Sequence, residues 1–110
     1  MSAISFRELE QRLQARAAEA NAEASYTRKL LDRGVPYCAK KLGEEAIETV
    51  IAAVGEDRDR LVAEAADLIY HLLVVLLARG IPLSAVEEVL AARTSQSGLQ
   101  EKATRPRGQG

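Results

Sequence analysis

Apolar residues recur along most of this chain at the three- and four-residue intervals that are typical of amphipathic helices. A first segment begins at Ser5, where Glu8 three residues later completes a capping-box pattern. Its apolar stripe, which extends to about residue 24, consists of Leu9, Leu13, Ala17, Ala20 and Ala24. A second, shorter segment ends at Gly34, a residue type that commonly terminates helices. The pattern therefore predicts two helices in the first third of the chain.

Two longer segments follow, separated by a short polar turn. Pro36 suits the first turn of a helix that continues to about residue 54 and ends at Gly55. Either Asp57 or Asp59 can begin the next helix, which ends at Gly80. Because the connection is so short, we expect these two helices to form an antiparallel hairpin.

A last helix and a polar tail complete the chain. Ser84 with Glu87 forms another capping-box pattern, which predicts a helix through about Arg93. No stretch alternates as a strand would, so the predicted fold class is all-α, a bundle of four to five helices around the central hairpin. We assign residues 1–95 to one helical domain and residues 96–110 to a polar, basic tail without periodicity.

The run Leu68–Ala78 is apolar nearly all round, and only Tyr70 and His71 interrupt its aliphatic residues. It is shorter than the roughly 20 residues that cross a bilayer and is bracketed by Asp67 and Arg79, so a core helix is the better interpretation. Such a helix has to be covered on most sides. We therefore predict a homodimer with this helix at or near the interface, while a central helix inside one monomer is the alternative.

Composition narrows the class of protein further. The 110 residues suit one domain, with 47% hydrophobic and 28% charged residues and a net charge of -1. This balance gives no support for a nucleic-acid-binding surface, which is usually strongly basic. The N-terminus lacks an apolar signal core, and the single Cys38 can form no intrachain disulfide. We expect a cytoplasmic protein without a membrane or nucleic-acid partner.

Four acidic residues occupy matching positions on the two arms of the predicted hairpin. Glu48 and Glu64 lie eight residues before and after position 56, and Glu45 and Asp67 lie eleven before and after it. At about 1.5 Å rise per residue, each pair falls at one height. Within each helix the two acids are three residues apart and share a face. Four carboxylates could therefore converge on one point.

Converging carboxylates repel one another unless a cation compensates them. Mg²⁺ prefers oxygen ligands, usually keeps several waters and bridges to substrate phosphates, so such a site indicates phosphate chemistry, with Mn²⁺ as a possible substitute. Glu44 precedes Glu48 by one helical turn and could be a further ligand or a base that orients water. The alternative is a solvated acidic face, for which the neighbouring basic residues are Lys40, Lys41, Arg58 and Arg60. Spacing alone does not separate these two interpretations.

The order of the acids resembles a known signature. The pattern E-E-x-x-E followed by E-x-x-D is similar to that of the all-α nucleoside-triphosphate pyrophosphohydrolases, which include MazG and the dimeric dUTPases. Four longer blocks resemble the phosphoribosyl-ATP pyrophosphohydrolase family in order and spacing, between about Phe6 and Arg105. These blocks read S-Y-T-R-K-L-L-D-R-G, A-K-K-L-G-E-E-A-I-E, E-A-A-D-L-I-Y-H-L-L-V and R-T-S-Q-S-G-L-Q-E-K-A.

This resemblance implies the Mg²⁺-dependent hydrolysis of phosphoribosyl-ATP to phosphoribosyl-AMP and pyrophosphate, the second step of histidine biosynthesis. It also implies a role for each acid, with Glu44 as a ligand or water-orienting base. The implied metal ligands are Glu45, Glu48, Glu64 and Asp67. Cations would have to bind the substrate's phosphates, and the candidates are Arg28, Lys29, Lys40, Lys41, Arg93, Lys102 and Arg105. Lys41 could instead pair with Glu45, one turn away.

Three other residues have open roles. His71, one turn after Asp67, could hold a ligand carboxylate or be a buried structural histidine. Cys38 is interpreted as a core residue, and Tyr26 could stack on a base or pack in the core. Two other functions stay open as alternatives. One is a MazG-like house-cleaning enzyme acting on ordinary or damaged nucleoside triphosphates, and the other is a helical dimerisation module without chemistry.

Overall fold

The computed structural model describes residues 3–19, 25–55 and 57–95. Within these ranges it contains five α-helices and no strand, which confirms the predicted all-α class. The helices are α1 (Phe6–Ala17), α2 (Tyr26–Asp32), α3 (Val35–Val54), α4 (Arg58–Ala78) and α5 (Leu83–Thr94). The predicted boundary between the domain and its tail stays a prediction, because the tail lies outside the described residues.

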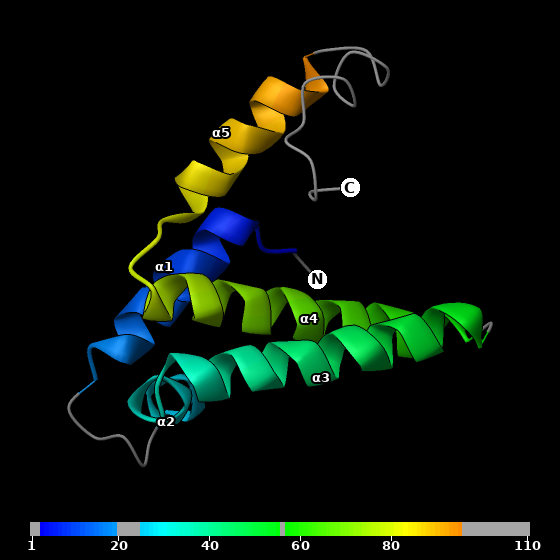
Figure 1. Cartoon of the computed structure of the whole chain (residues 1–110), viewed down its shortest axis with the longest axis horizontal. Coiled ribbons are helices and arrows are strands. Elements are labelled where there is room, and N and C mark those ends of the chain that lie inside the picture. The colour runs from blue at the N-terminus through cyan, green and yellow to red at the C-terminus, as the bar shows by residue number, and fades with distance from the viewer. Residues whose placement is uncertain (1–2, 20–24, 56, 96–110) are drawn as a thin grey trace.

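The two longest helices, α3 and α4, lie side by side as an antiparallel hairpin (Figure 1). Pro36 lies in the first turn of α3, and Gly55 caps its end. Asp57, one of the two expected start positions, is the N-cap of α4, and its side chain accepts a hydrogen bond from the Arg60 amide at 3.2 Å. The central hairpin expected from the turn residues is therefore confirmed.

The core lies at the end of the hairpin that is distant from its turn, where α1 and α2 pack against it (Figure 1). Its buried members come from all five helices, and they are Leu13, Leu30, Cys38, Leu73, Val74 and Leu83. Gly34 has a φ of 91°, which a residue with a side chain rarely adopts, and it forms the corner between α2 and α3. The first two helices thus cover one end of α4 and leave the other end to α3.

The first and last helices differ from their expected bounds. The predicted stripe to residue 24 is wrong in extent, because α1 ends at Ala17 with Ala18 as its C-cap. The stripe positions Ala20 and Ala24 lie outside the described residues. The Ser5–Glu8 capping box itself is confirmed. For α5, Ser84 is not the cap, since the helix begins at Leu83 with Pro82 as its N-cap. Leu83 is buried against the core, and this burial sets the start of the helix.

The apolar helix α4 is longer than its most hydrophobic run suggests. It has 21 residues, and an 18-residue stretch within it has a mean hydropathy of 2.0; this length and composition suit a membrane span but are shared by core helices. His71, Leu73 and Val74 are buried under the neighbouring helices, but only 17% of the apolar stretch is buried, so the described part of one chain does not cover α4 on most sides. Large apolar side chains are more exposed on α3, where Ile47, Val50 and Val54 are 62%, 65% and 79% exposed.

Candidate metal centre

Three acidic side chains from the two arms of the hairpin converge. Glu45 comes from α3, and Glu64 and Asp67 come from successive turns of α4. Each offers one carboxylate oxygen, and these three oxygens lie within 4.8 Å of one another. The helical spacing explains the convergence, because residues three apart on α4 share the face that α3 covers. The expected approach of acids across the turn is thus seen for three of the four.

A threonine that the sequence did not single out joins the two helices at this point. The Thr49 hydroxyl lies 2.7 Å from the carbonyl oxygen of Glu45, one turn back on α3. It also lies 3.2 Å from the carbonyl oxygen of Glu64 on α4. Its one proton is shared between two acceptors on the backbone of two of the acids. Its position one turn after Glu45 was visible in the sequence, but the contact with α4 was not.

The electrostatics of the cluster reflect its crowding. Loss of hydration raises the pKa of Glu64 above its ordinary 4.5, and the negative charges of Glu45, Glu48 and Asp67 raise it further. A hydrogen bond shared with Glu45 acts in the same direction. A carboxyl group in this position binds a proton or a cation more readily than an isolated one does.

Glu48 lies beside the cluster rather than within the group of three. Its carboxylate pairs with the Arg60 guanidinium at 3.3 Å across the hairpin, and both side chains are about half exposed. Its charge still contributes to the raised pKa of Glu64. An exposed pair of this kind stabilises a protein weakly, by roughly 0.2–1 kcal/mol, so Glu48 can exchange Arg60 for another cation at little cost.

Glu44, Lys41 and Asp67 are all close enough to His71 for their charges to affect it. His71 is buried, and burial is the main cause that lowers the pKa of its imidazole from 6.5. The Lys41 charge lowers this pKa further, while Asp67 and Glu44 raise it. Within the described part of the chain, the buried His71 Nδ1 has no hydrogen-bond partner. The burial of His71 therefore favours a buried structural histidine over a residue that holds a ligand carboxylate.

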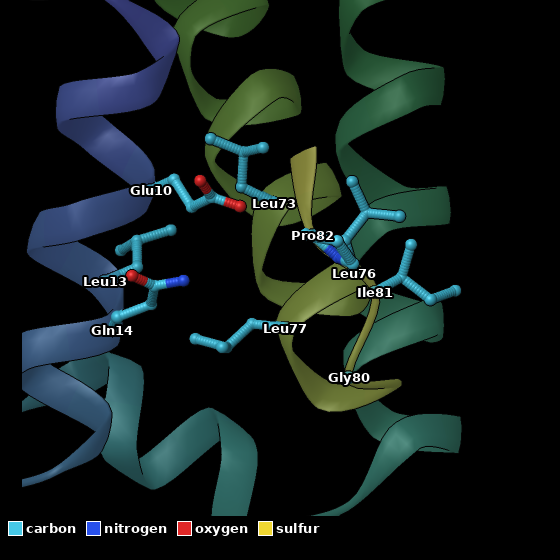
Figure 2. A pocket seen from close by; sticks show the side chains of 9 residues that line it. All are labelled: Glu10, Leu13, Gln14, Leu73, Leu76, Leu77, Gly80, Ile81 and Pro82. Atoms are coloured by element: carbon cyan, nitrogen blue, oxygen red, sulfur yellow. The ribbon is translucent and has the colours of Figure 1, made fainter. Parts of the chain in front are cut away.

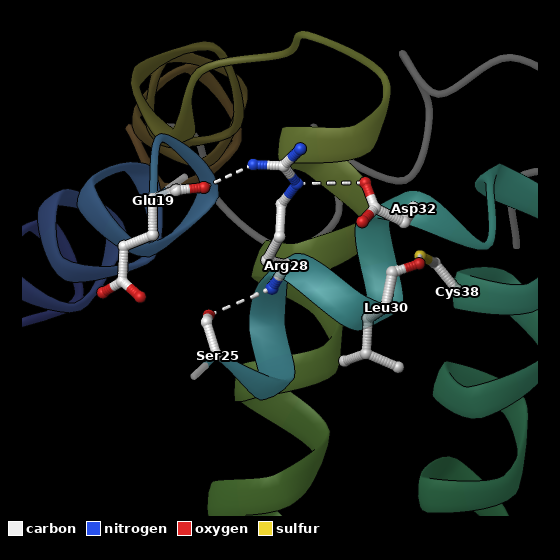
Figure 3. Close-up of polar contacts among 6 residues, drawn as sticks. All are labelled: Glu19, Ser25, Arg28, Leu30, Asp32 and Cys38. Carbon is white, nitrogen blue, oxygen red and sulfur yellow. Dashed lines mark hydrogen bonds and ion pairs between the residues drawn. The ribbon is translucent and has the colours of Figure 1, made fainter. Parts of the chain in front are cut away.

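The other predicted substrate contacts are spread over the molecule. The Arg28 guanidinium bonds to the Asp32 carboxylate at 3.0 Å and to the backbone oxygen of Glu19, so it links α2 to the chain that follows α1 (Figure 3). Lys29 is exposed on α2, and Arg93 is half-buried in the last turn of α5. Lys102 and Arg105 lie outside the described residues.

Cys38 is a core residue, as predicted. It is 1% exposed, and its thiol donates to the Leu30 carbonyl oxygen at 3.2 Å (Figure 3). Burial raises the pKa of this thiol, which opposes a nucleophilic role. Tyr26 is half exposed and stacks on Tyr70 with ring centroids 6.3 Å apart, so its ring belongs partly to the core and partly to the surface.

Among the described residues, two cavities beside α4 differ in their distance from the acids, and one of them is lined by Asp67. The first, of about 190 Å³, lies between α1, the end of α4 and the segment Gly80–Pro82 (Figure 2). Glu10 and Gln14 are its polar members, and its apolar wall includes Leu73 and Leu77. The second, of about 430 Å³, lies between the start of α1 and the middle of α4, and Asp67 lines it.

The donor set suits a hard divalent cation. Carboxylate oxygens are the ligands that Mg²⁺ and Mn²⁺ prefer, and Mg²⁺ commonly uses few protein carboxylates together with water and phosphate oxygens. The pKa of Glu64 is raised first by lost hydration and then by the charges of neighbouring acids, and a bound cation would offset that repulsion. The geometry can therefore position a cation and a phosphate group between α3 and α4.

Comparison with known proteins shows the family of this chain. The family model described as phosphoribosyl-ATP pyrophosphohydrolase matches residues 6–94. A Bradyrhizobium diazoefficiens protein named phosphoribosyl-ATP pyrophosphatase 1 is 60% identical over 105 residues, 96% of this chain and 98% of that protein. The phosphoribosyl-ATP pyrophosphatase of Nitrobacter winogradskyi is 61% identical over 95 residues, which cover 86% of this chain and 81% of that protein. By this sequence identity and the matched family model, the chain belongs to the phosphoribosyl-ATP pyrophosphohydrolase family.

Proposed function

We propose that this chain hydrolyses phosphoribosyl-ATP to phosphoribosyl-AMP and pyrophosphate, as part of histidine biosynthesis in the cytoplasm. One water is consumed, and the bond between the α- and β-phosphates breaks. The observation that carries the proposal is the convergence of Glu45, Glu64 and Asp67 within 4.8 Å, in a chain of this family.

In this proposal the acid cluster holds Mg²⁺, which Mn²⁺ can replace. Glu45, Glu64 and Asp67 are the ligands that the geometry supports directly, and Glu48 joins them when it leaves Arg60. When bound, the ion polarises the phosphate oxygens and lowers the pKa of a coordinated water. Thr49 positions the two helices through its contacts with both backbones, which keeps the opposing carboxylates at a fixed separation.

The remaining residues bind substrate and orient water. Glu44 is the proposed base, since it lies beside the cluster without belonging to the group of three. Lys41 is the cation best supported as a phosphate contact. Its charge and that of Asp67 both affect the pKa of His71, so Lys41 lies near an acid of the cluster. Arg28, Lys29, Arg93, Lys102 and Arg105 complete the predicted contacts, and Arg28 would have to exchange its present partners.

Substrate preference tests the proposal. Pyrophosphate release from phosphoribosyl-ATP should exceed release from ATP by at least about 100-fold in kcat/KM, which corresponds to roughly 2.7 kcal/mol of transition-state discrimination. The measurement is steady-state turnover of both compounds with Mg²⁺. Comparable rates would favour a house-cleaning enzyme for ordinary nucleotides, and no turnover of either would favour a dimerisation module.

We also propose that the protein is a homodimer. The radius of gyration is 16.1 Å, larger than the roughly 13 Å expected for a compact chain of this length. The exposed apolar side chains of α3 form one stripe, since Ile47, Val50, Ile51 and Val54 recur at helical spacing. The stripe supports an interface on α3, next to the α4 position that the sequence favoured.

A further inference from the structure

The second cavity has the size and lining of a binding site for a small flat molecule. It is an open depression of about 430 Å³ between the start of α1 and the middle of α4. Small-molecule sites commonly have volumes of about 300–1,000 Å³ and mostly apolar walls. One wall of this cavity is formed by Ile4, Phe6 and Leu9, and the other by Ile69 and Tyr70.

Asp67 connects this cavity to the acid cluster. It is the only residue that both lines the cavity and belongs to the converging acids among the residues that the structure describes. A molecule in the cavity can therefore extend past Asp67 towards Glu45 and Glu64 without leaving the protein surface. The continuity favours one ligand that occupies both places, with its apolar part in the cavity.

The two aromatic side chains of the cavity, Phe6 and Tyr70, differ in their contacts and in their exposure. The Tyr70 hydroxyl is 2.6 Å from the Thr27 hydroxyl, and the Tyr70 ring packs against His71 at 5.1 Å between centroids, so it is held in place. Phe6 is 55% exposed, although it is the first residue of α1 and its ring has little apolar cover. A half-exposed aromatic side chain at the mouth of a cavity can stack on a ligand at small cost in ordering.

We propose that the cavity between Phe6 and Tyr70 binds the purine base of the substrate, an inference that rests on the proposed function. The substrate's phosphates and riboses are strongly polar, and the base is its only part with apolar faces. With the base in the cavity, the ribose that carries the phosphate chain can extend past Asp67 to the acid cluster. Phe6 and Tyr70 supply stacking surface, and Ile4, Leu9 and Ile69 exclude water from the base.

Product inhibition tests the proposal, because one product, phosphoribosyl-AMP, contains the base and the other, pyrophosphate, does not. In the full-length protein, Phe6→Ala should raise KM for phosphoribosyl-ATP and the inhibition constant of phosphoribosyl-AMP by about 5- to 150-fold, the range expected for loss of one stacking contact. The inhibition constant of pyrophosphate, which lacks a base, and kcat should change by less than about twofold. Phe6→Tyr keeps the ring and should retain the wild-type KM.

A matched control is Val62→Ala on α4, which removes apolar surface of similar exposure, 53%, outside this cavity. It should leave all three constants unchanged. Equal effects of Phe6→Ala on phosphoribosyl-AMP and pyrophosphate, or no effect on either, would overturn the proposal. A loss of oligomeric mass in Phe6→Ala would assign the cavity to a second copy of the chain.

Failure of the proposed function gives other results than failure of the base site alone. If wild-type protein turns over ATP as well as phosphoribosyl-ATP, the same inhibition measurements are made with AMP and pyrophosphate against ATP turnover. A selective effect of Phe6→Ala on AMP would then retain the base site under another substrate. If wild-type protein turns over neither compound, both proposals are overturned together.

Discussion

The carboxyl group of Glu64 lies close to three other acids, Glu45, Glu48 and Asp67, and its pKa is raised by lost hydration and by their charges. Glu48 shows the opposite situation, since Arg60 already compensates its charge. The two residues look alike in the sequence, and only their neighbours on the other helix distinguish them. Helical spacing makes Glu48 and Glu64 equivalent, but the structure distinguishes an acid among other acids from one that is paired with arginine.

Replacing Glu64 with glutamine should separate repulsion from metal binding. Without divalent cations, Glu64→Gln should raise the melting temperature, because one of the mutually repelling charges is gone. With Mg²⁺, wild-type protein should gain thermal stability and the variant should gain much less. Turnover should fall at least about 100-fold, the size expected when transition-state charge loses a stabilising group. The measurements are thermal unfolding with EDTA or Mg²⁺ and steady-state kinetics.

The exposed Glu88→Gln on α5 is the control and should match wild type in all three. Retention of the Mg²⁺ response and of turnover in Glu64→Gln would remove Glu64 from the proposed ligands. The same experiment on Glu48→Gln tests the fourth ligand, and unchanged turnover there would limit the site to three acids.

His71 predicts a pH dependence of stability. Its pKa is lowered below 6.5 mainly by burial, so the folded protein binds its proton less readily than the unfolded chain does. The free energy of unfolding should therefore fall as pH decreases below about 6.5, until the lowered folded pKa is passed. His71→Phe should remove this part of the pH dependence. Urea unfolding without divalent cations between pH 5 and pH 7.5 measures it, and an unchanged slope in the variant would contradict the assignment.

At the scale of elements, α5 depends on the rest of the molecule for its first turn. Leu83 is buried in the core, and its amide donates to the Glu10 carboxylate at 2.7 Å. A carboxylate at a helix N-terminus is favourable for the free amides there. The Arg7–Glu87 pair at 3.7 Å is exposed and adds little. A residue 73 positions earlier therefore performs the capping that the Ser84–Glu87 pattern seemed to supply locally.

Glu10→Ala should loosen the attachment of α5. The loss of this charged hydrogen bond should lower the free energy of unfolding by about 1 kcal/mol and increase hydrogen exchange at the Leu83 amide. Glu10→Gln keeps an acceptor and should be milder. The neighbouring exposed Gln11→Ala is the control. If Glu10→Ala and Gln11→Ala show the same hydrogen exchange at the Leu83 amide, the hydrogen bond to Glu10 does not stabilise the first turn of α5.

At the scale of the whole molecule, the hairpin is covered on one end by α1 and α2 and carries exposed apolar residues elsewhere. Figure 1 shows α5 extending away from the hairpin rather than packing along it. With the stripe on α3, this arrangement buries less apolar surface than one closed bundle would. A second copy of the chain is the partner that we propose for this surface.

The mass in solution tests the dimer. We expect about 24 kDa, twice the 11.9 kDa of one chain. Val50→Asp places a charge in the α3 stripe and should shift the protein towards about 12 kDa, since a buried unpaired charge is costly at an interface. Ala15→Asp on the exposed side of α1 is the control. Light scattering measures the molecular mass of the wild type and both variants. A monomeric wild type would contradict the proposed homodimer.

Local features of the sequence were sufficient for the all-α fold, the hairpin and the approach of Glu45, Glu64 and Asp67. Helical spacing and the residues of a short turn fix these relations, because both act between neighbours in the chain. Helical periodicity predicted too long an α1 and the wrong cap for α5, whose first turn depends on the buried Leu83 and on Glu10.

Contacts between distant residues decided the rest. The pairing of Glu48 with Arg60, the bridge made by Thr49 and the capping of α5 by Glu10 each join separate helices. The burial of His71 and the cavity beside Asp67 likewise exist only once α4 is packed against its neighbours. Periodicity specifies which residues share a face of one helix, but the partner of that face follows from how whole helices pack.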